Sequence, residues 1–173
     1  MNLEEVLNYR RSVRAYDKEK PIDPERVKHC LELATLAPNS SNMQLWEFYH
    51  ITDPQLLAKV SHACLGQKAT STASQVVVFV VRRDAYRKHA RFVLDFERAN
   101  IQRNSPKERQ AKRIKDRELY YGFLMPFVYA RFLGLLGLFR KLLANVISIF
   151  RPMMLEVSEN DMRVVAHKSC ALA

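Results

Sequence analysis

Apolar residues recur every three or four positions along much of the chain, which is the period of an amphipathic helix. Near the start, Leu3, Val6 and Leu7 share one helical face. The sequence Asp23-Pro24-Glu25 is typical of a helix start, because a capping aspartate precedes a proline in the first turn. The pattern predicts helices over residues 2–9, 24–37, 54–64, 82–104, 106–118 and 159–173.

Two stretches are strand candidates instead, over residues 46–51 and 75–81. The second is a nearly continuous apolar run rich in valine, which is typical of a strand buried on both faces. In the helix that follows this strand, we expect Phe92, Phe96 and Ala99 to form the apolar stripe that faces the core.

The segment over residues 123–150 is rich in Phe, Leu, Ile and Val, but it contains Arg131, Arg140 and Lys141. A membrane span needs about 20 uninterrupted apolar residues, and these charges divide the segment into shorter runs. We therefore expect a helical insertion over residues 104–157 that covers a functional site or packs on a second subunit. An interfacial helix on a membrane surface is the alternative, because basic and apolar residues are mixed in this segment.

The chain has 173 residues, which fits one domain, and a formal net charge of +10. Between Arg82 and Arg117 there are 13 Lys or Arg and 5 Asp or Glu, so this stretch carries +8 of that charge. We interpret these charges as solvated helix faces and expect no nucleic-acid partner. The alternative is a basic module that binds an anionic partner, such as nucleic acid or a membrane surface.

The three cysteines, Cys30, Cys64 and Cys170, lie far apart in the sequence. None has the Cys-x-x-Cys or Cys/His spacing of a metal site, so we expect reduced thiols, a cytoplasmic location and no metal. Cys30 falls on the apolar face of its helix, where we expect a core thiol. With four glycines, the sequence has neither the Gly-rich dinucleotide fingerprint nor a P-loop.

The stretch Tyr9–Tyr16 is basic and has no apolar period of its own; it reads Tyr-Arg-Arg-Ser-Val-Arg-Ala-Tyr. In an extended conformation alternate side chains point the same way, so Arg10, Ser12 and Arg14 would share one face. Two guanidiniums and a hydroxyl are suitable donors for a phosphate monoester. A solvated basic loop is the alternative interpretation.

A second stretch, residues 36–48, reads Leu-Ala-Pro-Asn-Ser-Ser-Asn-Met-Gln-Leu-Trp-Glu-Phe. Together the two stretches resemble the FMN-dependent nitroreductase family, in which Arg-x-Ser-x-(Arg/Lys)-x-(Phe/Tyr) is followed by Ala-Pro-Ser-Ser-x-Asn-x-Gln-Pro-Trp and a strand. The order and the spacing match, and so does Trp46. The chain departs from the family pattern at Asn39, which is usually Ser, and at Leu45, which is usually Pro.

The resemblance implies an α+β fold, a three-layer α/β/α sandwich with a mostly antiparallel sheet. It covers the N-terminal half to two-thirds of a family domain, in which more helix, further strands and a late basic element would follow residue 173. It therefore implies a single domain over residues 1–173 that is incomplete at its C-terminus.

The resemblance also implies a homodimer with FMN at the subunit interface. Arg10, Ser12 and Arg14 would hold the FMN phosphate and the ribityl or pyrimidine side, and Arg11 would add backbone or fringe contacts. Gln67 would reach the pyrimidine edge of the flavin.

The other implied contacts come from the partner subunit. In the family the Ala-Pro-Ser-Ser segment reaches the flavin of the opposite subunit, and the matching residues of this chain are Pro38, Asn39, Ser40 and Asn42. A plain polar loop is the alternative interpretation of this segment, because its residues favour turns.

The activity implied by the resemblance is that of an FMN-dependent NAD(P)H oxidoreductase. FMN would take a hydride from NADH or NADPH and pass the reducing equivalents to a nitro compound, a quinone or a similar small molecule. No nucleophile–base pair or carboxylate pair stands out in the sequence, so no catalytic residue is named. A truncated homologue that cannot hold FMN is the other interpretation, beside the basic anion-binding module.

Overall fold

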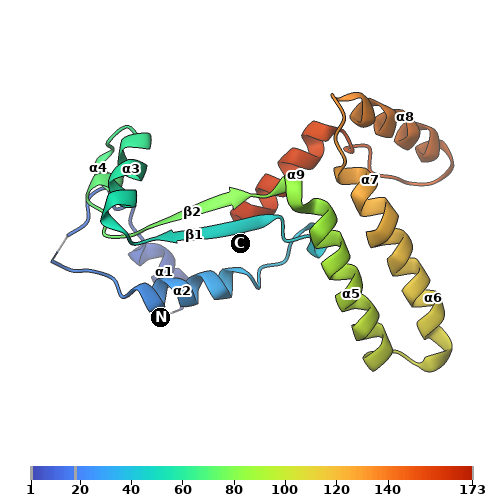
Figure 1. The fold of residues 1–173 in the computed structure, drawn as a ribbon, viewed down its shortest axis with the longest axis horizontal. Helices are drawn as coiled ribbons and strands as arrows, with labels where there is room; N and C mark the ends of the chain where they lie inside the picture. Colours follow the sequence, from blue (N-terminus) through green and yellow to red (C-terminus); the bar gives the residue numbers. More distant parts are fainter. Residues whose placement is uncertain (1, 18, 173) are drawn as a thin grey trace. The chain divides into compact units, whose positions relative to one another are not determined.

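The computed structural model describes residues 2–17 and 19–172. These residues divide into two compact units, which we describe one at a time (Figure 1). The first unit comprises the described residues of Met1–Leu33 and Phe48–Val78, and the second comprises those of Ala34–Glu47 and Phe79–Ala173. The expected insertion over residues 104–157 lies within the second unit and stays a prediction.

Short helices make up most of the first unit. They are α1 (Leu3–Tyr9), α2 (Pro24–Ala34), α3 (Pro54–Ala63) and α4 (Lys68–Ser71). Side chains cap two of them: Asn2 Oδ1 accepts from the Glu5 N–H at 2.9 Å, and Asp53 Oδ1 accepts from the Leu56 N–H at 2.8 Å. No residue of these four helices is buried in the described chain. The expected core thiol is therefore wrong, because no other element covers the face of α2 that carries Cys30, and this thiol is exposed.

The two strands form at the predicted positions, as β1 (Trp46–Ile51) and β2 (Val76–Val81). They pair with each other as a two-stranded antiparallel sheet. The expectation that β2 is buried on both faces is wrong, because none of its residues is fully buried and Phe79 is 54% exposed. Each strand is an edge of this two-stranded sheet. The run of valines is also not enclosed between two covered faces, since none of these residues is fully buried.

Helices dominate the second unit. They are η1 (Ser40–Asn42), η2 (Arg83–Ala85), α5 (Tyr86–Asn104), α6 (Lys107–Arg117), the π-helical η3 (Glu118–Leu124), α7 (Met125–Tyr129), α8 (Leu135–Phe150) and α9 (Glu159–Leu172). The chain turns at Ser105-Pro106, as predicted, and α5 and α6 then pack side by side (Figure 1). Ion pairs cross this hairpin, with Arg98 bonded to Glu118 at 2.6 Å and Arg117 to Glu97 at 3.1 Å.

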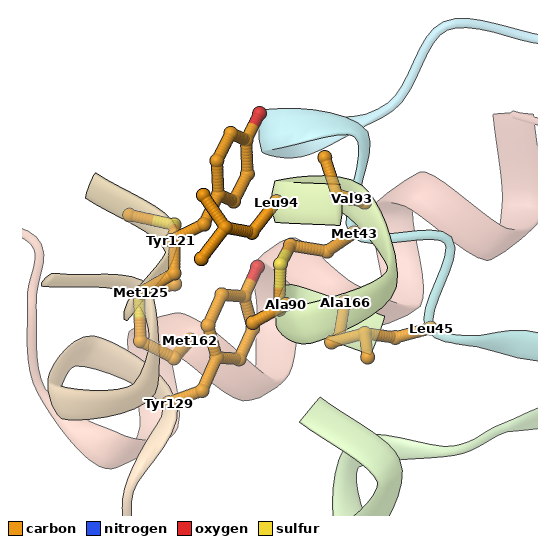
Figure 2. Close-up of a cluster of buried hydrophobic side chains, with 10 residues drawn as sticks. All are labelled: Met43, Leu45, Ala90, Val93, Leu94, Tyr121, Met125, Tyr129, Met162 and Ala166. Atoms are coloured by element: carbon orange, nitrogen blue, oxygen red, sulfur yellow. The ribbon is translucent and has the colours of Figure 1, made fainter. Parts of the chain in front are cut away.

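The core of the second unit gathers around the loop that precedes β1 (Figure 2). Met43 and Leu45 from that loop are almost fully buried, at 1% and 3% exposed. They pack with residues of α5, η3, α7 and α9, namely Ala90, Val93, Leu94, Tyr121, Met125, Tyr129, Met162 and Ala166. The loop is therefore the part of the chain on which these helices converge.

The apolar stripe of α5 differs from the expected one. Its buried residues include Ala90, Val93 and Ile101, whereas Phe92 and Phe96 are 69% and 52% exposed. The buried positions follow helical spacing, so the period was predicted correctly and the face was not. The small Ala90 lets α5 approach Met43 and Leu45 closely, which a phenylalanine at this position would prevent.

The apolar segment over residues 123–150 is mostly helical, with a non-helical break over residues 130–134 between α7 and α8. Pro126 lies in the first turn of α7, directly after the π-helical η3, and the backbone of Leu124 and Met125 is helical, so Pro126 does not end the helical run. Among the residues that the structure describes, no helix is both long and apolar enough to cross a bilayer.

Candidate cofactor-binding site

The basic stretch leaves the C-terminal end of α1. The Arg10 N–H donates to the Val6 carbonyl at 3.0 Å and ends the helix, and residues 10–14 then run without regular secondary structure. Arg10, Ser12 and Arg14 are all exposed. Arg10 Nη1 donates to Ser12 Oγ at 3.4 Å, so the structure brings together two of the three predicted phosphate donors.

The side chain of Arg11 bonds backbone carbonyls at the end of α1, whereas that of Arg10 bonds Ser12. Arg11 Nη1 donates to the Arg10 carbonyl at 2.9 Å and to the Asn8 carbonyl. A cation at this place interacts favourably with the free carbonyls at the C-terminal end of α1. The side chain of Arg11 therefore caps a helix, and its expected fringe contact with a cofactor stays a prediction.

The far end of the basic stretch is tied to α4 within the same unit. The Tyr16 N–H donates to Thr72 Oγ1 at 2.9 Å, and Thr72 Oγ1 donates to the Lys68 carbonyl at 2.7 Å. Gln67 lies just before α4, and its carbonyl accepts from the Thr70 N–H at 2.9 Å. Its side chain is exposed. The first unit thus carries the arginine donors and Gln67 on connected segments.

The loop over residues 38–44 belongs to the second unit and has an unusual backbone. Ser41, Asn42 and Gln44 have φ values of 53°, 51° and 47°. This left-handed region is rare for residues other than glycine and costs about 1–2 kcal/mol each. Strained backbone of this kind persists only where its surroundings fix it, and it concentrates at functional sites.

Polar side chains of the loop itself supply part of that fixation. Asn39 Oδ1 accepts from the Gln44 N–H at 2.9 Å, and Gln44 Nε2 donates to Asn42 Oδ1 at 2.9 Å. Asn39 Nδ2 also donates to Asn42 Oδ1 at 3.5 Å. The departure at Asn39 therefore has a structural role, because its longer side chain reaches across the loop to Gln44. Pro38 is exposed at the entry to the loop.

Aromatic residues far along the chain supply the rest, and the sequence patterns gave no signal for them. The Tyr120 and Ser41 hydroxyls share a hydrogen bond of 2.7 Å, and the Tyr121 hydroxyl donates to the Ser41 carbonyl at 3.1 Å. His89 Nδ1 donates to the Met43 carbonyl at 2.9 Å. Burial raises the pKa of Tyr121 above its ordinary value, so its hydroxyl is a protonated donor at neutral pH.

The predicted cofactor residues thus fall into two sets. Arg10, Arg11, Ser12, Arg14 and Gln67 lie in the first unit, and Pro38, Asn39, Ser40 and Asn42 lie in the second. In the first set, donors for a phosphate sit on an exposed segment. The second set forms a strained loop with a rigid support.

Comparison with known proteins identifies the family to which the chain belongs. A model of the nitroreductase family matches residues 7–173, which is nearly the whole chain. The chain belongs to the nitroreductase family. The two motifs that suggested this family lie at the start of the matched region.

Curated relatives in the nitroreductase family match the chain over limited segments. Protein DrgA of Synechocystis is 30% identical over 108 residues, which are 62% of this chain and 48% of that protein. The oxygen-insensitive NADPH nitroreductase of Helicobacter acinonychis is 31% identical over 75 residues, which are 43% of this chain and 36% of that protein. The chain therefore matches less than half the length of these relatives.

Solved structures show the fold. A nitroreductase family protein from Streptococcus pneumoniae has a TM-score of 0.62 and 20% identity, over 99% of this chain and 66% of that chain. A protein from Exiguobacterium sibiricum, in complex with FMN, has a TM-score of 0.57 and 20% identity, over 99% of this chain and 65% of that one. The chain has the α+β nitroreductase fold, and this part of the expectation is confirmed.

Proposed function

We propose that this nitroreductase family chain binds FMN and acts as an NAD(P)H-dependent oxidoreductase. The observation that carries the proposal is the pair Arg10 and Ser12, in contact at 3.4 Å at the start of the family match. Nitroreductases among its relatives and an FMN-bound structural neighbour support it.

The phosphate end of FMN fits the donors of the first unit. Arg10 and Arg14 offer guanidinium forks, and Ser12 offers a hydroxyl, on a segment that is open to a ligand. The guanidinium of Arg11 is held by α1, so in this proposal Arg11 contributes through its backbone. Gln67 presents an exposed amide that can reach the pyrimidine edge of a flavin.

The second set contributes from the partner subunit of a homodimer. Pro38, Asn39, Ser40 and Asn42 would border the flavin, and the bonds from Tyr120 and Tyr121 to Ser41 would keep their loop in place. A loop fixed before binding loses little conformational entropy when the ligand arrives. In this proposal the strained backbone is retained because it holds the loop in the conformation that binds the flavin.

Bound FMN would accept a hydride from NADH or NADPH and reduce a nitro compound, a quinone or a similar acceptor. The protein's residues would bind and orient the cofactor, and none acts as an acid or base in the proposal. We place the enzyme in the cytoplasm, because Cys30, Cys64 and Cys170 are all free.

The proposal is tested by the visible spectrum and by FMN titration of matched double variants. Arg10→Ala with Arg14→Ala should weaken FMN binding at least about a hundredfold, since charge-assisted hydrogen bonds contribute about 1.5–3 kcal/mol each. The control, Lys107→Ala with Lys112→Ala, removes the same charge from the exposed face of α6 and should leave FMN affinity unchanged. Equal FMN affinity in both double variants would refute the phosphate assignment. If the purified chain stays colourless after incubation with FMN and removal of the unbound cofactor, the proposed function is refuted.

A further inference from the structure

Helix α8 has its faces reversed relative to an ordinary amphipathic helix. The side that packs against the protein carries Gly137, Arg140 and Ala144, which are two of the smallest residues and a charged one. Most of the large apolar side chains are exposed instead, and seven of them are 54–85% exposed. They include Leu138, Phe139, Leu142, Val146, Ile149 and Phe150.

This orientation is fixed at two positions of the helix. A Cβ atom on Gly137 would lie 2.8 Å from the Glu159 backbone nitrogen, so α8 meets the start of α9 at a distance that needs glycine. Arg140 is 3% exposed, and its Nε donates to the Val157 carbonyl at 2.8 Å. Its Nη1 donates to the Phe127 and Ala130 carbonyls at 2.9 Å and 3.0 Å.

A rotation of α8 that buried its leucines would move Arg140 away from its partners and break these three charge-assisted bonds. The apolar face therefore points outward because the protein holds it there, although its own residues would favour burial. Figure 1 shows α8, in orange, after the α5–α6 hairpin and α7 in the chain.

The charges within the segment that carries this face have one sign, and acidic residues resume at Glu156, which is exposed. From Leu119 to Leu155 the sequence contains no Asp or Glu, and Arg131, Lys141 and Arg151 are exposed. Apolar residues continue on both sides of the helix, with Leu133 at 90% and Met154 at 61% exposed. We call the exposed residues of the range 131–155 the α8 surface.

We propose that the α8 surface docks on an anionic lipid bilayer, with α8 lying in the plane of the interface. A helix of 16 residues is about 24 Å long, which is shorter than a hydrocarbon core of about 30 Å. An interfacial helix buries its apolar face at the level of the headgroups, and nearby Lys and Arg side chains bind lipid phosphates. A second copy of this surface would instead bring a second set of cations to the contact, and the segment 131–155 has no carboxylate of its own to pair them.

Sedimentation with vesicles tests the proposal on the full chain. Binding is expected to vesicles of phosphatidylcholine with one part in three of phosphatidylglycerol, and it should weaken as salt is raised. Phosphatidylcholine alone should bind far less. Absence of binding to the anionic vesicles would overturn the proposal.

Matched variants then locate the contact. Phe139→Ser with Phe150→Ser should weaken vesicle binding by on the order of tenfold or more, because two large apolar contacts are lost. Phe92→Ser with Phe96→Ser makes the same change at exposed positions of α5 and should bind like the parent chain. Equal loss in both variants would overturn the assignment to α8. Circular dichroism checks that each variant is folded.

A second pair of variants tests the charges. Lys141→Gln with Arg151→Gln should lower the affinity for anionic vesicles by roughly fivefold per cation removed. Lys107→Gln with Lys112→Gln, on α6, should change it little. Sedimentation velocity without lipid tests whether a second copy of the chain covers the α8 surface instead. If the Phe139/Phe150 variant forms smaller species than the parent chain, the face is a contact between copies and the proposal is overturned. None of these measurements depends on FMN.

Discussion

At the scale of single residues, a contact within a short motif was predicted, and the contacts between distant residues were not. Arg10 and Ser12 are two positions apart, and they meet in the structure. Tyr120 meets Ser41 across 79 positions of sequence, and it lies between the predicted helix over 106–118 and the apolar segment over 123–150. A local pattern carries no information about such a partner, so the support of the 38–44 loop needed the structure.

The hydrogen bond between Tyr120 and Ser41 makes this support testable. Tyr120→Phe removes one hydroxyl from a 2.7 Å hydrogen bond and keeps the ring in place. We expect the free energy of unfolding in urea to fall by about 1 kcal/mol, the usual net value of one such bond. Tyr9→Phe, at a residue that is 78% exposed, should change the unfolding energy by much less. If both variants unfold alike, Tyr120 does not hold the loop.

At the scale of elements, the positions of helices and strands were predicted well, and their faces less well. Helical period and capping residues placed α1, α3, α5 and α6, because these signals are local. The exposed Phe92 on α5 and the exposed Phe79 on β2 show the limit. Which face of an element is covered depends on what packs against it, and the apolar pattern predicts the opposite of the observed orientation in α8.

Gly137 offers a test of that orientation. Gly137→Ala gains helix propensity of about 1 kcal/mol, but it forces a methyl group against the Glu159 backbone at 2.8 Å. Overpacking against rigid backbone costs typically about 1–3 kcal/mol, so we expect a net loss of stability in urea unfolding. Gly122→Ala is the control, because a Cβ atom there would meet nothing within 4 Å, and it should be neutral or stabilising. A Gly137→Ala variant as stable as the Gly122→Ala variant would mean that α8 and α9 do not pack this closely.

At the scale of the whole molecule, the two units carry different halves of the proposed FMN site. The α+β nitroreductase fold followed from two short motifs, since they mark a family whose architecture is known. The proposed homodimer assigns the arginine donors to one subunit and the 38–44 loop to its partner.

Subunit mixing tests this assignment directly. Arg10→Ala with Arg14→Ala disables one half of the site, and Asn42→Ala weakens the other by removing the acceptor that Gln44 Nε2 binds. Each variant alone should bind FMN much more weakly than the parent chain. In a mixture refolded from equal amounts, about half of the dimers contain both variants, and each of these has one site with two intact halves. We therefore expect about a quarter of the parent's FMN binding to return. If the two halves of a site belong to the same subunit, mixing restores nothing, because every subunit in the mixture is then defective in its own site.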